Sequence, residues 1–404
     1  MKILHTSDWH LGQNFMGKSR EDEHQAFFVW LLQIIESNNI TLLIVAGDIF
    51  DTTTPPNYAL ELYYNFLKKL SNIEELTTVI VAGNHDSIAT LTTSKQLLEL
   101  LNVHVITKGE KEENQLIPVY QKSQLKAFVC AIPFLRDTLL RKTVSAEAIK
   151  EREMLINHGI KRHYKGLYQE ALKMLDKLGF SPKEIPLIAT GHLTAIGARS
   201  SESERDIYIG GTVNISGDFL GKYFDYVALG HMHLNQRVGS SSHVCYSGSP
   251  IALSFAEANS VKKVNIVEFF ESEKNIEVST LEIPTYRPLH LLKGNLEQIL
   301  EWLRGIENKQ TWIEIQLTDD DNPFASNQTI RSLAEELGLI LLAVKIDRSK
   351  KSLKAKDMRV ISLTDLGVNE VFEKRLEMEN MESESFEKEV LKTFKSLLNK
   401  VESQ

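Results

Sequence analysis

Eight side chains that can bind a divalent metal or move a proton follow five short apolar stretches of the sequence. They are Asp8, His10, Asp48, Asn84, His85, His192, His231 and His233. A single histidine near the end of a strand more often forms a structural hydrogen bond than binds a metal. The whole set of residues, and not any one member, therefore indicates a metal site. Oxygen donors mixed with neutral imidazoles suit divalent Mn, Fe or Zn and not a structural zinc held by thiolates.

The number of candidate ligands favours two metal ions. Without His85 the set still holds seven side chains, which is more than one ion needs. Two ions about 3.5 to 4 Å apart, sharing one carboxylate, would use all seven and would clamp the attacking and leaving oxygens of a phosphoryl displacement. Asp48 stands alone after its apolar stretch and is the best placed to bridge the ions.

The apolar stretches predict the elements that position these residues. They begin near Ile3, Leu42, Val79, Leu187 and Tyr226, and their near-continuous apolar character is typical of strands buried on both faces. Ligand sites in such sheets lie beyond the carboxyl ends of the strands. Helical spacing over 22–37 and 57–70 completes two strand-helix-strand units, so we expect an α/β fold.

Residues 12–19 match the Walker A pattern of nucleotide-binding loops. A true P-loop follows its strand directly, whereas Asp8 to Leu11 intervene here. The pattern therefore favours a flexible loop near the metal site, with Lys18 and Arg20 as candidates for a contact with substrate phosphate. Nucleotide binding is the weaker alternative.

The second half of the sequence changes character. Residues 143–179 have a helical pattern and carry basic and aromatic residues between Lys161 and Tyr168. These residues favour a solvent-exposed helix face, and a DNA contact is the weaker alternative.

Pro284 to Pro288 is the best candidate for a linker, and a β-α-β-α-β pattern follows it up to residue 346. The acidic tail after Asp365 has a helical apolar stripe that suits a groove on a protein partner.

Composition restricts the class of protein. The chain has 404 residues, 42% of them hydrophobic, and a net charge of -8, which argues against a broad nonspecific grip on DNA. Two bound divalent ions would reverse the sign of the electrostatic field near the metal site.

The N-terminus lacks a secretory apolar stretch and no segment is long enough to span a membrane, so we expect a cytoplasmic protein. Cys130 and Cys245 lie in strand-like stretches and are predicted core residues.

The order of the motifs resembles the calcineurin-like metallophosphoesterase superfamily. The motifs are Asp-x-His at 8–10, Gly-Asp at 47–48, Gly-Asn-His-Asp at 83–86, Gly-His at 191–192 and Gly-His-x-His at 230–233. The longer sequences of residues 5–12 and 47–51 are similar to those of the SbcD family of bacterial nuclease subunits. This resemblance implies a four-layer α-β-β-α sandwich over 1–283, a smaller α+β capping domain over 289–364, and a helical tail over 365–404.

The resemblance also implies roles for the site residues. One ion is expected at Asp8, His10, Asp48 and His233, and the other at Asp48, Asn84, His192 and His231, with Mn²⁺ the expected metal. His85 is expected to donate a proton to the leaving sugar oxygen, and Asp86 is expected to orient it.

The implied function is a DNA nuclease that depends on two metal ions. The expected activities are double-strand 3′-5′ exonuclease and single-strand or hairpin endonuclease, in DNA repair, recombination and replication. The tail is expected to bind an SbcC-like ATPase of the SMC family, with a homodimer of the nuclease inside a heterotetramer. A phosphatase or cyclic-nucleotide phosphodiesterase on the same fold is the alternative. A scaffold without activity is disfavoured because no ligand position is missing.

Overall fold

A computed structural model of the chain describes residues 1–109, 112–136, 149–200, 204, 215–270, 275–318, 323–346 and 393–394. The chain divides into two units, Met1–Ile346 and Asp347–Gln404, and every feature described below belongs to the first. The end of the predicted capping domain, 347–364, and the predicted tail, 365–404 apart from 393–394, lie outside the described residues.

The first sheet has six strands in the order β14-β13-β1-β4-β5-β6. The strands are β1 (Lys2–Thr6), β4 (Leu42–Ala46), β5 (Thr77–Val81), β6 (Val103–Ile106), β13 (Lys263–Phe269) and β14 (Ile276–Glu282). The four strands from β1 to β6 run parallel, as their apolar character predicts, and every residue of β4 and β5 is buried. Strands β13 and β14 form an antiparallel hairpin, and β13 pairs antiparallel with β1.

The second sheet also has six strands, in the order β11-β12-β10-β9-β8-β7. They are β7 (Leu116–Gln121), β8 (Gln124–Cys130), β9 (Leu187–His192), β10 (Tyr226–Gly230), β11 (Gln236–Arg237) and β12 (Val244–Tyr246). The central strands β8, β9, β10 and β12 are parallel, and β7 and β11 form antiparallel edges. The two ligand-bearing strands of this sheet, β9 and β10, are therefore neighbours that end on the same side.

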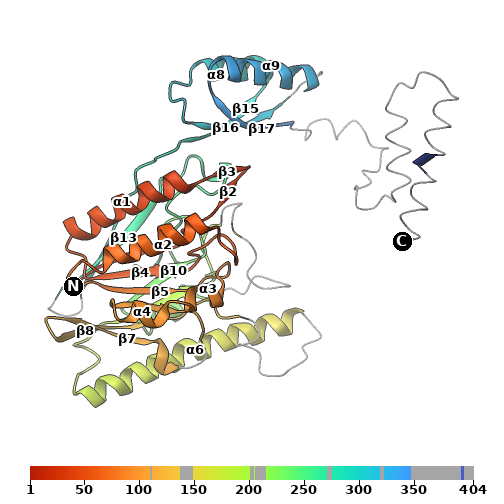
Figure 1. The fold of residues 1–404 in the computed structure, drawn as a ribbon. Helices are drawn as coiled ribbons and strands as arrows, with labels where there is room; N and C mark the ends of the chain where they lie inside the picture. Colours follow the sequence, from red (N-terminus) through yellow and green to blue (C-terminus); the bar gives the residue numbers. More distant parts are fainter. Residues whose placement is uncertain are drawn as a thin grey trace. The chain divides into compact units, whose positions relative to one another are not determined.

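The two sheets pack face to face, and helices cover their outer faces (Figure 1). The layer between the sheets joins residues such as Ile44 and Val79 to Ile188 and Ala228. The first sheet is covered by α1 (Glu21–Ser37), α2 (Asn57–Leu70), α3 (Ile88–Thr92) and α4 (Lys95–Glu99). The second is covered by α6 (Ile149–Leu178) and α7 (Gly217–Gly221), and two short 3₁₀ turns are η1 (Glu112–Gln115) and η2 (Phe255–Glu257). The predicted four-layer α-β-β-α sandwich is confirmed.

The stretch that matches the Walker A pattern is a small β-hairpin, β2 (Asn14–Phe15) paired with β3 (Lys18–Ser19). Its turn residues Met16 and Gly17 both have positive φ, at 50° and 83°, as a tight hairpin turn of this type requires. The next helix, α1, begins only at Glu21. The flexible loop predicted here is thus a hairpin, and it lacks the helix start that a phosphate-binding loop needs.

The part of the predicted capping domain that the structure describes, residues 289–346, is called the cap below. It is built from β15 (Leu289–Gly294), α8 (Leu296–Arg304), β16 (Trp312–Leu317), α9 (Pro323–Glu336) and β17 (Ile340–Ile346). The three strands are parallel and the two helices pack on one face of their sheet, so the β-α-β-α-β order is as predicted and the connections are of the α/β type. Since β14 ends at Glu282 and β15 begins at Leu289, residues 284–288 connect the first sheet of the sandwich to the sheet of the cap. The domain boundary itself stays a prediction.

A buried cluster around Trp312 joins the cap to the sandwich. Phe15 of the hairpin stacks on the Trp312 ring with centroids 5.6 Å apart. The guanidinium carbons of Arg20 and Arg287 lie 5.3 and 4.7 Å from the same ring. Glu23 forms ion pairs with both arginines, with Oε1 2.7 Å from Arg20 Nη2 and Oε2 3.4 Å from Arg287 Nε. Two cations that share one carboxylate therefore lie against the indole ring of the cap.

Both cysteines are free and buried, as predicted. In the part of the chain that the structure describes, no helix has the length and apolar character to cross a bilayer.

Candidate metal centre

The two sheets meet at their carboxyl ends, and the predicted ligands lie at this junction. The backbone N–H of His231, after β10, donates to Asp8 Oδ1, after β1, over 2.9 Å. Nδ1 of His192, at the end of β9, lies 2.9 Å from the carbonyl oxygen of Ala46, the last residue of β4. These contacts span 223 and 146 residues of sequence, so the predicted convergence of the strand ends is present in the fold.

All seven predicted ligands belong to this junction. Two groups made only of predicted ligands have ligand atoms within 4.8 Å of one another: Asp8, His10 and His233, and Asp8, Asp48 and His192. Asn84 Oδ1 lies 2.9 Å from His192 Nε2, and the rings of His231 and His192 pack edge to face at 5.4 Å. The geometry therefore offers two adjacent positions for a cation.

Asp48 lies between these two positions. Its Oδ2 atom is 3.7 Å from His10 Nε2 and 3.2 Å from His192 Nε2. Burial alone would raise the pKa of Asp48, but the neighbouring His192 and His10 outweigh it and hold that pKa well below its usual range. An ionised carboxylate placed between two imidazoles is suited to bridge two ions.

His10 presents a nitrogen that protein groups leave unused. Its Nδ1 lies 3.0 Å from Asp51 Oδ1, while its buried Nε2 has no hydrogen-bond partner among the described residues. A carboxylate that accepts from one ring nitrogen fixes the tautomer and leaves the lone pair of the other for a metal. Because a buried polar atom without a partner is costly, this arrangement fits a metal ligand.

His192 shows the same requirement from the other side of Asp48. A carbonyl oxygen only accepts, so Nδ1 of His192 must carry the proton that it donates to Ala46. In the neutral ring Nε2 is then a bare lone pair that faces two oxygens, Asp48 Oδ2 and Asn84 Oδ1. Burial would lower the pKa of His192, but the Asp48 carboxylate outweighs burial and raises the pKa to about 9. The raised pKa means that, without a metal, a proton binds to Nε2 and lies among the three acceptor atoms. A divalent metal would take the place of that proton.

His231 meets the other requirement for a ligand, which is a neutral ring. Burial, reinforced by the positive charge of nearby His192, places the pKa of His231 well below its usual range. The ring is therefore uncharged when a metal arrives.

The backbone at the strand ends is shaped to aim the ligands. Asp8, His10, Asp48 and His231 all have positive φ, at 53°, 48°, 50° and 98°. Non-glycine residues rarely adopt this conformation, which costs of order 1–3 kcal/mol each and is found mainly at functional sites. Four of the seven predicted ligands share this conformation, so the fold maintains strain at the centre.

Glycine is required beside these ligands because the chain segments approach so closely. A Cβ on Gly47, which has φ of 93°, would lie 2.2 Å from His192 Nδ1. A Cβ on Gly83 would lie 2.1 Å from Asp48 Oδ1. The glycine in each motif thus leaves room for a ligand from a different strand.

His85 lies at the edge of the centre and is half-buried. Its Nδ1 is 2.7 Å from the carbonyl oxygen of Asp51, and its backbone N–H donates to Asp48 Oδ1 over 2.9 Å. Its ring packs edge to face on His10 with centroids 4.9 Å apart. Because the Asp51 carbonyl only accepts, Nδ1 of His85 carries a proton and Nε2 is the atom left to exchange one.

The prediction that Asp86 orients His85 is wrong. The Asp86 carboxylate is fully buried and accepts hydrogen bonds from the backbone N–H groups of Ile49, Phe50 and Gly83. Burial raises the pKa of Asp86 to about 6 despite these bonds. Asp86 therefore braces the segments after β4 and β5, and the Asp51 carbonyl contacts His85 in its place.

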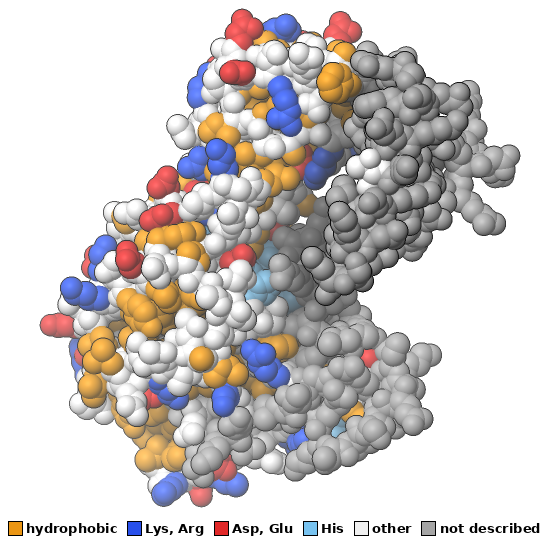
Figure 2. All heavy atoms as spheres, turned by 45° about the vertical axis from the view of Figure 1, so that its right-hand side comes forward, with side chains coloured by type: hydrophobic (Ala, Val, Ile, Leu, Met, Phe, Trp, Pro, Cys, Tyr) orange, Lys and Arg blue, Asp and Glu red, His pale blue; other side chains and the backbone are white. Residues whose placement is uncertain are grey.

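Asp51 is a site residue that none of the predicted roles includes. Its carboxylate orients His10 and its carbonyl oxygen contacts His85, so one residue fixes two histidines. The available signal is the second aspartate in Gly47-Asp48-Ile49-Phe50-Asp51. Figure 2 shows histidine side chains, in pale blue, reaching the surface near the middle of the face it presents.

Two further predictions of substrate contacts can be compared with the structure. Arg20 is 1% exposed and its guanidinium bonds Glu23 and the Ala252 carbonyl, so the expectation that it contacts phosphate is wrong. Lys18 is exposed and stays a candidate. In the helical cluster, Arg162 and Lys165 are exposed, as a solvated face requires. The prediction is wrong for Tyr164, which is buried and donates to the Thr190 carbonyl.

Known proteins resemble this chain along most of its length. The calcineurin-like phosphoesterase family matches residues 1–235, and the family described as type 5 capsule protein repressor C-terminal domain, SbcD_C, matches residues 285–380. The SbcD component of the nuclease SbcCD from Escherichia coli K12 is 38% identical, covering 95% of this chain and 94% of that protein. Proteins of the same name from Bacillus subtilis and Rhodobacter capsulatus are 28% and 32% identical, covering 90% and 72% of this chain and 91% and 71% of those proteins.

Proposed function

The chain belongs to the calcineurin-like phosphoesterase family and, within it, to the SbcD nuclease subunits, and from this premise we propose that it is a DNA nuclease that depends on two divalent metal ions. The observation that carries the proposal is Asp48, whose Oδ2 lies between His10 and His192 at the junction of the two sheets. Relatives that match nearly the whole chain are named nucleases, which favours this function over a phosphatase or a cyclic-nucleotide phosphodiesterase.

The donor set fits the two ions. Asp8, His10, Asp48 and His233 would hold one, and Asp48, Asn84, His192 and His231 the other, with Mn²⁺ as the proposed metal because the ligands mix hard oxygens with imidazoles. When bound, the metals supply an activated water nucleophile at neutral pH and neutralise charge on the phosphoryl oxygens.

The residues of the chain supply orientation and a proton. Asp51 fixes His10 through its carboxylate, and Ala46 fixes His192 through its carbonyl oxygen, so both rings turn Nε2 toward Asp48. His85 is the general acid: its Nδ1–H is held by the Asp51 carbonyl, and Nε2 donates a proton to the leaving sugar oxygen. The hydrogen bond from the His85 backbone to Asp48 ties the position of the acid to that of the bridging carboxylate.

The proposed substrate is DNA. The protein is proposed to act as a 3′-5′ exonuclease on duplex ends and as an endonuclease on single strands and hairpins. The proposed partner is an SbcC-like ATPase of the SMC family, in a heterotetramer that contains two copies of this chain, acting in the cytoplasm in repair, recombination and replication. The relatives are named as one component of the SbcCD nuclease, which supports this partner. The cap, fixed to the sandwich through Trp312, is proposed to help select the DNA.

The substrate class is tested by incubating metal-stripped protein with Mn²⁺ and either a labelled DNA hairpin, a linear duplex, or p-nitrophenyl phosphate esters. We expect cleavage of both DNAs at rates far above that of any small ester. Hydrolysis of the esters without cleavage of DNA would replace the nuclease by a phosphatase.

A further inference from the structure

Glu257 is a fully buried carboxylate that lies against His233. It ends the 3₁₀ turn η2, and its Oε1 is 3.4 Å from His233 Nδ1. His233 belongs to the group of ligand atoms that includes Asp8 and His10. The Glu257 side chain therefore contacts a predicted metal ligand from outside every motif of the sequence.

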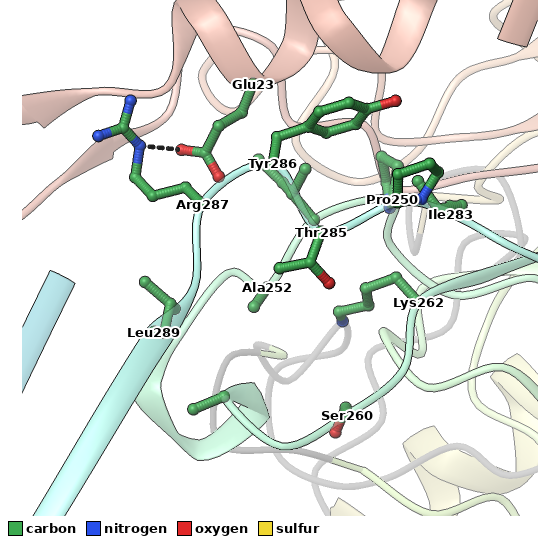
Figure 3. A pocket seen from close by; sticks show the side chains of 13 residues that line it. Glu23, Pro250, Ala252, Ser260, Lys262, Ile283, Thr285, Tyr286, Arg287 and Leu289 are labelled. Carbon is green, nitrogen blue, oxygen red and sulfur yellow. Dashed lines mark ion pairs between the residues drawn. The ribbon is translucent and has the colours of Figure 1, made fainter. Parts of the chain in front are cut away.

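The carboxylate of Glu257 is itself held in place. Lys262 forms an ion pair with Glu257 Oε2, and the backbone N–H of Leu253 donates to the same oxygen over 3.2 Å. The Lys262 ammonium also donates to the His233 carbonyl, at 3.2 Å, and to Ser249 Oγ, at 2.9 Å. Figure 3 shows Lys262 reaching into the pocket beneath the linker, beside Ala252 and Thr285.

These contacts keep Glu257 charged although it is buried. The Lys262 ammonium pairs with Oε2 and the Leu253 N–H donates to the same oxygen, and both contacts favour the ionised form of the carboxyl group. An ionised carboxylate has no proton to donate, so it accepts from Nδ1–H of His233. In the neutral ring Nε2 is then the nitrogen that carries the lone pair.

We propose that Glu257 is a positioning residue, which holds His233 in the tautomer and orientation that bind a metal ion. It does for His233 what Asp51 does for His10, so the two histidines of one ion each have a carboxylate behind them. Outer carboxylates of this kind orient ligand imidazoles and make them more basic. The inference rests on the proposed function, because it takes His233 as a ligand.

The test measures metal binding and not only activity. Mn²⁺ binding to Glu257→Gln is followed by equilibrium dialysis and by electron paramagnetic resonance, which distinguishes a coupled pair of ions from a single ion. We expect one of the two ions to bind about 10–100-fold more weakly, with loss of the coupled signal and its return at high Mn²⁺. Wild-type affinity for both ions would overturn the proposal.

Two further variants separate positioning from folding. Glu257→Asp keeps the charge opposite Lys262 but withdraws the carboxylate from His233, so its metal affinity should also fall; an unchanged affinity in this folded variant would overturn the proposal. Glu23→Gln removes a different buried, ion-paired carboxylate and is expected to lower the melting temperature while both ions bind as in the wild type.

A failure of the proposed site itself would look different. His233→Ala is expected to lose the same ion completely. If His233→Ala binds both ions normally, the assignment of the ligands is wrong. If His233→Ala loses an ion and neither Glu257 variant weakens it, the positioning role alone is wrong.

Discussion

Nε2 of His192 lies 3.2 Å from Oδ2 of Asp48, which joins the last residue of a strand in the second sheet to a residue two positions past the end of a strand in the first. The contact exists because the sheets pack face to face and their carboxyl ends meet. Neither atom has a proton to offer the other when His192 is neutral, so the pair is stable only with a cation or an added proton. The following predictions depend on this relationship and on the residues around it.

Replacing Asp48 with Asn should disable both metal positions, because one carboxylate serves both. We expect the chain to bind fewer than two ions and DNA cleavage to fall by more than the roughly 100-fold that loss of an outer partner costs. Metal content measured by mass spectrometry after dialysis checks the first effect, and cleavage of a labelled hairpin checks the second. Two tightly bound ions in Asp48→Asn would remove Asp48 from the bridging role.

His85→Ala should abolish the proton donor and retain the ions. Loss of general acid catalysis predicts a fall in the rate of about 10²–10⁴-fold, with metal content equal to that of the wild type. His290→Ala, at an exposed histidine of β15, is the control and should cleave normally. Ligand atoms of His85, His10 and Asp51 also lie within 4.8 Å of one another, so loss of metal from His85→Ala would reassign His85 as a ligand.

Metal affinity should rise with pH because the ion must displace a proton from His192. The pKa of His192 in the metal-free fold is about 9, against an ordinary value of 6.5. At pH values below that pKa, metal binding that releases one proton becomes about tenfold tighter for each unit by which the pH rises. Isothermal titration between pH 6.5 and 8 measures this slope. An affinity that does not vary with pH would contradict the acceptor arrangement at His192.

Stability of the metal-free protein should change in the opposite direction. Because the folded-state pKa of His192 lies above the unfolded value, its proton stabilises the fold fully below about pH 6.5, and this contribution is lost as the pH rises through about 9. Denaturant unfolding of the metal-free protein should therefore give a lower midpoint at pH 9 than at pH 6.5. Addition of Mn²⁺ should remove most of the difference.

Trp312→Ala should loosen the cap from the sandwich. Trp312 is 2% exposed and packs against Phe15 and two guanidinium groups, and removal of such a side chain costs about 3–5 kcal/mol. We expect a lower melting temperature in calorimetry, with the cap unfolding before the sandwich. Trp302→Ala, at a cap residue that is 41% exposed, should change stability by less than about 1 kcal/mol. Equal effects of the two substitutions would mean that the cluster does not fix the cap.

The sequence predicts those site residues that lie at the end of a buried strand or within two residues of it. Asp8, Asp48 and His192 could be identified because each ends an apolar stretch, and parallel strands deliver their ends to one rim. The strained backbone of Asp8 and Asp48, and the glycines beside the ligands, follow from how closely the two sheets approach, which no single stretch of sequence contains.

The contacts behind the ligands could not be predicted in the same way. Asp86 adjoins His85 in the sequence, yet its side chain turns inward to the backbone of Ile49 and Phe50. Arg20 belongs to a stretch that resembles a phosphate loop, but Glu23, three residues later, neutralises it in a buried pair. Glu257 reaches His233 across 24 residues through a turn with no motif. The Asp86 and Glu257 contacts join segments that are distant in sequence, and the burial of the Arg20–Glu23 pair likewise depends on tertiary packing.

The central claim is that the clustered ligands hold two ions that together cut DNA. It is tested most directly by titrating metal-stripped protein with Mn²⁺ while cleavage of a labelled DNA hairpin is followed. The account predicts no cleavage without metal and a rate that reaches its plateau when two ions are bound per chain. Cleavage by the metal-free protein, a plateau at one ion, or two bound ions without cleavage of any DNA would contradict it.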